Sequence, residues 1–155
     1  ELQKKGFLNL ALGVGSKGNN YLRFKIWKKL ISKGFIFPKL IHKNSYISKF
    51  AVISEGSQIF NQSIINSGSY VGKNSVINNN TVIEHGCSIG SHVFTGTSAT
   101  VCGDAKIKDL SFLGAKSCVL PEVEIGKEAI IAAGSLVNKD VKGGTRVKGV
   151  PAKKF

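Results

Sequence analysis

Several features that usually classify a protein are missing from this 155-residue chain. No apolar run is long enough to cross a bilayer and no signal peptide is present, so we predict a cytoplasmic protein without membrane insertion. Three cysteines, an odd number without framework spacing, argue against a disulfide scaffold and fit a reducing compartment. Methionine is absent and the first residue is Glu1, so we expect the remainder of a longer protein.

Acidic residues are scarce, with nine Asp or Glu against twenty-two Lys or Arg and a net charge of +13. Residues 1–49 hold eleven of the basic residues and only Glu1 as an acid. Such a basic segment suits nucleic acid, a membrane surface or a phosphorylated small molecule. A genome biased toward Lys, Asn and Ile produces the same pattern with no function attached. No recognised nucleic-acid motif accompanies the charge, so we predict no nucleic-acid partner.

What the chain does contain is an uninterrupted six-residue period. Aliphatic residues occupy sixteen of seventeen successive steps, and only Thr95 interrupts them: Ile41, Ile47, Ile53, Ile59, Ile65, Val71, Ile77, Ile83, Ile89, Thr95, Val101, Ile107, Leu113, Val119, Ile125, Ile131 and Val137. Mostly small residues stand two positions before each step. Helices repeat every 3.6 residues and strands every 2, so neither explains the register. Hexapeptide repeats are typical of a β-helix in which three hexads make one turn, so residues 18 apart stack about 4.8 Å from one another.

The segment before the hexads has a different pattern. The apolar residues 7–12 predict a buried strand, and Gly13, Val14 and Gly15 begin a polar loop. Residues 21–33 carry Leu22 and Ile26 at helical spacing, with Gly34 as a stop signal. We therefore predict a partial α/β segment over residues 1–40 that covers the first coil of the β-helix.

The β-helix domain is predicted over residues 41–155. The period fails at Gly143, and residues 141–155 are expected to leave the coil as a tail or an extra loop. Cys87 falls on a small inward position and is predicted to be a packed core thiol.

Four motifs together resemble the hexapeptide-repeat sugar O- or N-acetyltransferases, typified by sialic acid O-acetyltransferase and UDP-amino-sugar N-acetyltransferase. They are Leu40-Ile41-His42, Ile83-Glu84-His85, Lys139-Asp140-Val141 and Gly149-Val150-Pro151-Ala152-Lys153. The resemblance implies a left-handed β-helix, a homotrimer, and acetyl-CoA bound between subunits. It also implies that residues 1–40 belong to a Rossmann-like subdomain for the nucleotide sugar, whose first strand and glycine-rich phosphate loop are missing here.

The pair Glu84-His85 is the strongest candidate for chemistry. An amine or hydroxyl that attacks a thioester must lose a proton, and an imidazole takes up protons near neutral pH. The resemblance makes His85 the general base, Glu84 its acidic neighbour, and Asn78 a supporting residue. The stacking rule places Gly103 over His85, where a glycine permits close approach and its N–H can bind an oxyanion. The plain alternative is a histidine that only caps a corner.

Acetyl-CoA is the expected co-substrate, and its acceptor is expected to be a nucleotide sugar or a sialic-acid-like sugar. Gly13, Val14 and Gly15 are candidates for contacting the acceptor. The candidate residues for acetyl-CoA are Gly103, Gly114, Ala115, Ala133, Lys139, Pro151 and Lys153. The basic residues near the end suit the phosphates of CoA, and a solvated tail explains them equally well.

The chain departs from the family pattern at Gly86, where relatives often have Asp or Glu, and at Phe94, where many carry a second His. His92 stands two residues before Phe94 and is interpreted as a surface residue. His42 is interpreted as a junction residue at the start of the coil.

Two other functions compete with acetyl transfer. A metalloenzyme on this coil needs three stacked His ligands, but the three histidines are 43 and 7 residues apart, and neither number is a multiple of 18. We therefore predict no metal. A non-catalytic scaffold would favour flat arrays of threonines or aromatics, which the sequence lacks. A degenerate relative that binds without reacting remains open.

Overall fold

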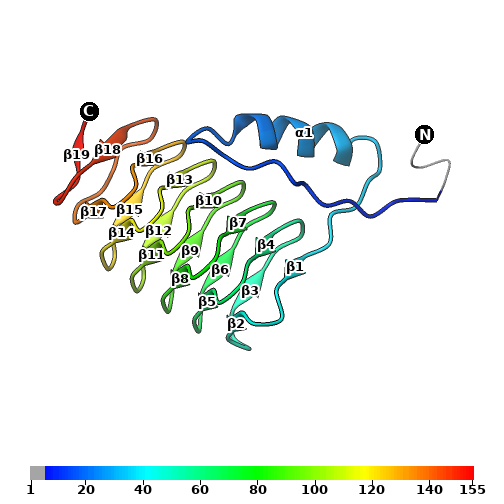
Figure 1. The fold of residues 1–155 in the computed structure, drawn as a ribbon, viewed down its shortest axis with the longest axis horizontal. Helices are drawn as coiled ribbons and strands as arrows, with labels where there is room; N and C mark the ends of the chain where they lie inside the picture. Colours follow the sequence, from blue (N-terminus) through cyan, green and yellow to red (C-terminus); the bar gives the residue numbers. More distant parts are fainter. Residues whose placement is uncertain (1–5) are drawn as a thin grey trace.

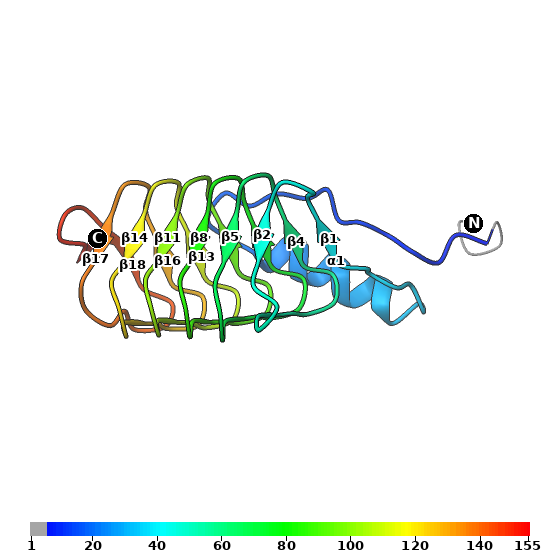
Figure 2. The same cartoon turned by 90° about the horizontal axis from the view of Figure 1, so that it is seen from below.

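The computed structural model describes residues 6–155, which form a parallel β-helix with one helix against its side (Figure 1). Each hexad folds as a two-residue strand followed by a turn, so three strands make one coil. The coils stack into a long prism with three flat sides (Figure 2). The predicted solenoid is confirmed.

Each side of the prism is a parallel sheet built from every third strand. The first sheet contains β1 (Leu40–Ile41), β4 (Gln58–Ile59), β7 (Val76–Ile77), β10 (Phe94–Thr95), β13 (Phe112–Leu113) and β16 (Ile130–Ile131), then β18 (Arg146–Lys148) and β19 (Lys153–Lys154). The second sheet contains β2 (Tyr46–Ile47), β5 (Ile64–Ile65), β8 (Val82–Ile83), β11 (Thr100–Val101), β14 (Cys118–Val119) and β17 (Leu136–Val137). The third contains β3 (Val52–Ile53), β6 (Tyr70–Val71), β9 (Ser88–Ile89), β12 (Lys106–Ile107) and β15 (Glu124–Ile125).

The turns form three corners, named here by the sheets they join. The first corner joins the first and second sheets, the second corner joins the second and third, and the third corner returns the chain to the first sheet. Strand pairing aligns residues that are three hexads apart, as in Ile65 with Ile83 and Ile83 with Val101. Any corner residue therefore stacks on the residue three hexads later.

The repeated aliphatic residues fill the interior of the prism and are almost all fully buried. Thr95, the exception in the period, is also buried. Its hydroxyl donates to the Val76 carbonyl (3.3 Å) and accepts the backbone N–H of Asn78 (3.1 Å). A buried hydroxyl needs such partners, so the break in the pattern is tolerated without an unpaired polar group. Cys87 is buried as predicted.

The end of the coil differs from the prediction of a departing tail. Val141 bridges to Ile125, and β18 pairs with β16 at a register shorter than the three hexads of the earlier coils. Val141 and Val147 are buried in the core, so the chain completes part of another coil before β19 folds back antiparallel on β18. The chain therefore does not leave the coil at residue 141, because a shortened register still places apolar residues over the last full coil.

The segment before the coil is only partly as predicted. Helix α1 (Tyr21–Ile31) is present and ends before Gly34, whose φ is +80°. The predicted strand at residues 7–12 is reduced to a single parallel bridge between Asn9 and Ile36. Phe7 is exposed rather than buried because no described element covers that face of the segment. Residues 1–5 of the predicted α/β segment lie outside the described residues.

Helix α1 runs along the third corner and leaves the first and second corners uncovered (Figure 1). Asn20 donates to the carbonyls of Leu110 (3.1 Å) and Ser111 (2.8 Å) at one end of the contact, and Gly56 donates to the Phe37 carbonyl beyond the helix. Residues 6–155 include no helix with the length and apolar character that a membrane crossing requires.

Candidate active site

The second corner carries the predicted pair of His85 and Gly103. His85 follows β8, and Gly103 occupies the equivalent position after β11, one coil further on. The imidazole lies directly against Gly103: a Cβ built on the glycine would be 2.7 Å from Cε1 and 2.8 Å from Nε2 of His85. The stacking rule therefore placed these two residues correctly, and only a glycine leaves room for the ring.

The main chain at Gly103 is suited to receive negative charge. Its carbonyl accepts the N–H of Glu122 (3.0 Å), but within residues 6–155 no acceptor contacts its own N–H. An N–H without an internal partner beside an imidazole is the arrangement that stabilises a developing oxyanion. Proton removal and charge stabilisation can thus occur within one corner.

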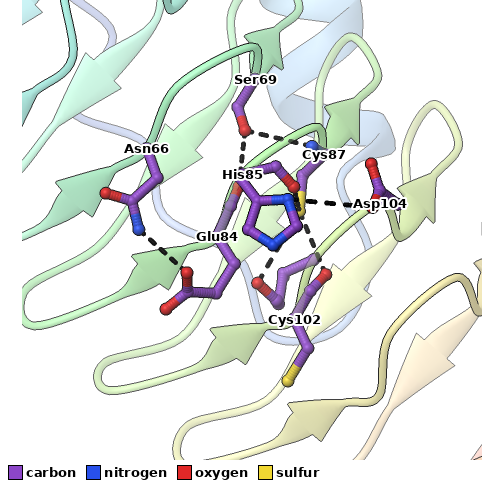
Figure 3. Close-up of polar contacts among 8 residues, drawn as sticks. Asn66, Ser69, Glu84, His85, Cys87, Cys102 and Asp104 are labelled. Atoms are coloured by element: carbon purple, nitrogen blue, oxygen red, sulfur yellow. Dashed lines mark hydrogen bonds and ion pairs between the residues drawn. The ribbon is translucent and has the colours of Figure 1, made fainter.

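Two carboxylates lie near this corner, and they have different partners (Figure 3). Glu84 accepts a hydrogen bond from Nδ2 of Asn66, 3.0 Å away, on the outer side of the second sheet. The carboxylate that faces the imidazole belongs to Asp104, whose Oδ2 lies 3.8 Å from Nδ1 of His85. The role of Glu84 as the acidic neighbour stays a prediction. Asp104 was missed, although counting three hexads on from Gly86 points to it.

Asn78 does not lie beside His85 in the single chain. It follows β7 at the first corner, whereas His85 follows β8 at the second corner of the same coil. Gly114 lies two coils above Asn78 at that first corner, and a Cβ on it would collide with the backbone of Ala133. Ala115 and Ala133 are exposed there, and the carbonyl of Ala115 accepts the N–H of Gly134. The predicted site residues therefore divide between two corners.

The loop of Gly13, Val14 and Gly15 lies over the first sheet and lines a pocket that also contains Asn78 and Phe94. The sequence gives no reason to expect these residues beside one another. The pocket joins them because the segment before α1 crosses the outer face of β4, where Nε2 of Gln58 donates to the Leu12 carbonyl (2.9 Å).

Arg23 holds this loop and was not identified from the sequence. Its Nη1 donates to the carbonyls of Leu12 (2.9 Å) and Val14 (3.0 Å), and its Nε contacts the Asn74 carbonyl at 3.4 Å. The side chain is buried in the contact between α1 and the coil, and burial lowers the pKa of the guanidinium to about 10. Leu22, which has helical spacing with Ile26, is exposed.

The remaining predicted residues for acetyl-CoA lie toward the end of the coil. Lys139 follows β17 at the second corner, three coils beyond His85, and is exposed. Pro151 and Lys153 are exposed between and on the final antiparallel strands. The basic end of the coil is therefore accessible to a phosphate-bearing molecule.

His92 corrects another prediction. It lies in the third corner, is 9% exposed, and packs edge-on against Phe24 (4.8 Å) and Trp27 (5.1 Å) of α1. It was taken for a surface residue because the position of α1 could not be inferred from the hexads. Burial lowers the pKa of His92, and the nearby charge of Arg23 lowers it further, while Asp109 opposes the shift. His42 is exposed, as expected for a junction residue.

No group of three or more His, Cys, Asp and Glu side chains in residues 6–155 has the arrangement of a metal site. Cys102 and Cys118 lie near one another on the second sheet, with their sulfur atoms 4.0 Å apart. Burial, and then the neighbouring Cys118, raise the pKa of Cys102 to about 11, so this thiol stays protonated at neutral pH.

The coil of hexads, with an imidazole packed against a glycine backbone, indicates a β-helix of the hexapeptide-repeat acyltransferase type. No family model matches the chain. A solved structure of PerB from Caulobacter crescentus, in complex with CoA and GDP-perosamine, is 30% identical with a TM-score of 0.95. The match covers 99% of this chain and 73% of that one. The chain belongs to the family of hexapeptide-repeat sugar acetyltransferases.

Two further proteins similar to this chain are also acetyltransferases. The acetyltransferase domain of PglB from Neisseria gonorrhoeae is 26% identical, with a TM-score of 0.90 over 95% of this chain and 70% of that one. A 2,3,4,5-tetrahydropyridine-2,6-dicarboxylate N-acetyltransferase from Staphylococcus aureus is 39% identical over 72 residues. That match covers 41% of this chain and 30% of the relative, so the chain spans less than a third of that curated protein.

Proposed function

We propose that the protein transfers the acetyl group of acetyl-CoA to an amino group of a nucleotide-linked sugar, with His85 as the general base. The observation that carries the proposal is the imidazole of His85 lying against the Gly103 backbone. Support for the reaction class comes from PerB, whose structure holds CoA and GDP-perosamine, and from the PglB domain, which was solved with acetyl coenzyme A. A hydroxyl acceptor, including a sialic-acid-like sugar, requires the same proton removal.

The reaction needs no covalent enzyme intermediate. Nε2 of His85 accepts the proton of the amine as the nitrogen attacks the thioester carbonyl. The Gly103 N–H binds the oxygen on which charge develops. When the C–S bond breaks, the imidazolium returns the proton to the sulfur of CoA, which leaves as a thiol. Glu84 and Asn78 are proposed to support this site, with Gly13, Val14 and Gly15 contacting the acceptor.

We also propose a homotrimer with acetyl-CoA between subunits. In one chain, His85 and Gly103 lie at the second corner, whereas Asn78 and the loop pocket lie at or beside the first. A symmetric assembly that sets the first corner of one subunit against the second corner of the next joins the two sets. Acetyl-CoA would then contact both corners: Gly103, Gly114, Ala115, Ala133, Lys139, Pro151 and Lys153.

The direct test is His85→Gln in the protein that contains this chain. Thiol release from acetyl-CoA would be followed with a panel of GDP- and UDP-linked amino sugars and with free sialic acids. Loss of a general base lowers kcat by about 10²- to 10⁴-fold. His42→Gln is the matched control, because this exposed histidine lies at the start of the coil. Turnover by His85→Gln at the unsubstituted rate rules out His85 as the base.

Mixing two inactive variants tests the shared site. His85→Gln and Asn78→Ala each disable one corner, so each homotrimer is expected to have low turnover. Refolding them together creates sites with an intact His85 from one subunit and an intact Asn78 from its neighbour, at roughly a quarter of all sites for a random mixture. A mixture as inactive as its parents would contradict the proposed assembly.

A further inference from the structure

Gly86 leaves a gap next to the candidate base. Its φ of +66° belongs to the left-handed region, where a glycine carries no steric cost. The same position in the next two coils is held by Asp104 (φ +61°) and Glu122 (φ +64°). These three residues stack in one column of the second corner, so the corner accepts an acidic side chain at this backbone conformation.

The gap is filled by the carboxylate of Asp104. A Cβ built on Gly86 would collide with Oδ1 of Asp104 and would lie 3.1 Å from its Cγ. The space of a side chain at position 86 is therefore taken by the acid of the following coil. The acid beside the imidazole therefore comes from the following coil and not from the residue that directly follows His85.

The backbone and the charge both direct Asp104 toward His85. The N–H of Asp104 donates to the His85 carbonyl (2.9 Å), which fixes the height of one residue over the other. Oδ2 of Asp104 then lies 3.8 Å from Nδ1 of His85, within the range of an ion pair. Among residues 6–155 Asp104 has no other ion-pair partner. Hydrogen bonds of catalytic groups are often long in unliganded sites and tighten when substrates bind.

We propose that Asp104, through the gap at Gly86, is the positioning residue of His85. This inference rests on the proposed function. The Nδ1–H of the neutral imidazole donates a hydrogen bond to the Asp104 carboxylate, which leaves the lone pair on Nε2 free to take the proton of the attacking amine. When Nε2 is protonated, the carboxylate balances the charge of the imidazolium until the proton passes to the sulfur of CoA. Asp104 acts through His85 and touches neither substrate.

The test is to delete the acid and then to move it. Asp104→Gly keeps the left-handed backbone and removes the carboxylate. We expect kcat to fall about 10- to 100-fold, since orientation and charge balance are lost, with the KM for acetyl-CoA unchanged. The matched control is Glu122→Gly, which makes a similar change at the next position of the column, away from the imidazole. We expect it to retain turnover.

Relocating the carboxylate sharpens the test. Gly86→Asp alone is expected to be slow, because the new side chain collides with the carboxylate of Asp104. The double variant Gly86→Asp with Asp104→Gly returns one acid to the gap and is expected to recover most of the lost turnover. Recovery by relocation separates a role at His85 from a general loss of stability, which a second substitution would not repair.

The pairing of Asp104 with His85 can also be tested without acetyl-CoA, and therefore without the reaction. Nitrogen-15 NMR of the His85 imidazole reports which ring nitrogen carries the proton. The Nδ1–H form is expected to dominate in the unsubstituted protein and in the relocated variant, and to decrease in Asp104→Gly. An unchanged tautomer in Asp104→Gly overturns the proposal, as does equal loss of turnover in Glu122→Gly. If the tautomer of His85 changes in Asp104→Gly but His85→Gln turns over at the normal rate, Asp104 still pairs with His85. His85 is then not the general base, and the proposed function fails.

Discussion

Two corners of the same coil carry a histidine each, and their environments are opposite. At the second corner the His85 side chain is 67% exposed and faces Gly103 and Asp104. At the third corner His92 is 9% exposed beneath α1. His85 is the second residue of its turn, whereas His92 is the third, with a φ of +60°, and α1 packs on the corner of His92. An open corner can accept a substrate, whereas a covered corner binds the helix to the coil.

This comparison predicts that substitutions at the open corner change turnover and leave stability nearly intact. Gly103→Ala places a Cβ 2.7 Å from the His85 ring and forces the ring away. Displacing a catalytic group by about 1 Å costs roughly 100-fold in rate. The free energy of unfolding should change by less than about 1 kcal/mol, since φ at this position is not in the left-handed region. Steady-state kinetics and urea unfolding measure the two effects, and unchanged kcat would contradict the close packing.

Substitutions at the covered corner should lower stability and leave turnover unchanged. Asn20→Ala removes the hydrogen bonds from its side chain to the carbonyls of Leu110 and Ser111. The Ser111 carbonyl keeps the N–H of Phe94 as a donor, whereas the Leu110 carbonyl loses the donor that the structure gives it. We expect α1 to be less stable on the coil by about 2 kcal/mol. Amide hydrogen exchange in α1 should then be about 30-fold faster.

The adjacent Asn19 provides the control for that experiment. Its Oδ1 accepts the N–H of Tyr21 at the exposed start of the helix, so Asn19→Ala should accelerate exchange much less. Chemistry at His85 should be unchanged in both variants. Equal exchange rates for the two variants would show that Asn20 does not anchor the helix.

The sequence could predict the open second corner better than the covered third corner. The coil and the contact of His85 with Gly103 follow from a period of three hexads, which is a local rule repeated without insertion. The same rule applied to Gly86 points to Asp104, although an acidic residue was expected next to the base in sequence.

The packing of α1 on the third corner could not be predicted from the hexad period. Leu22 has helical spacing with the apolar residues of α1, yet it is 61% exposed, and Arg23 is buried instead. The reason is that α1 packs on a corner, where carbonyl groups such as that of Asn74 need donors. The burial of His92 follows from the same docking, and hexad periodicity contains no information on it.

The smallest predicted effect is a dependence of stability on pH that belongs to the covered corner alone. Burial is the main cause that lowers the pKa of His92, with Arg23 adding to it. Below its ordinary pKa of about 6.5, the unfolded chain binds a proton at His92 that the folded chain does not. The contribution of neutral His92 to stability is therefore complete above that pH. It is lost as the pH falls toward the lowered folded-state pKa, by at most about 1.4 kcal/mol per pH unit.

His92→Asn isolates this contribution. The φ of +60° at position 92 suits asparagine, which the coil already uses at Asn74 and Asn80. Urea unfolding at pH 7.5, 6.5 and 5.5 should show a loss of stability in the unsubstituted protein that is smaller in His92→Asn. All other titrating groups are common to both proteins, so the difference between the two slopes measures His92. Equal slopes would mean that His92 takes up a proton in the folded protein as easily as in the unfolded chain, which a site enclosed by Phe24 and Trp27 does not permit.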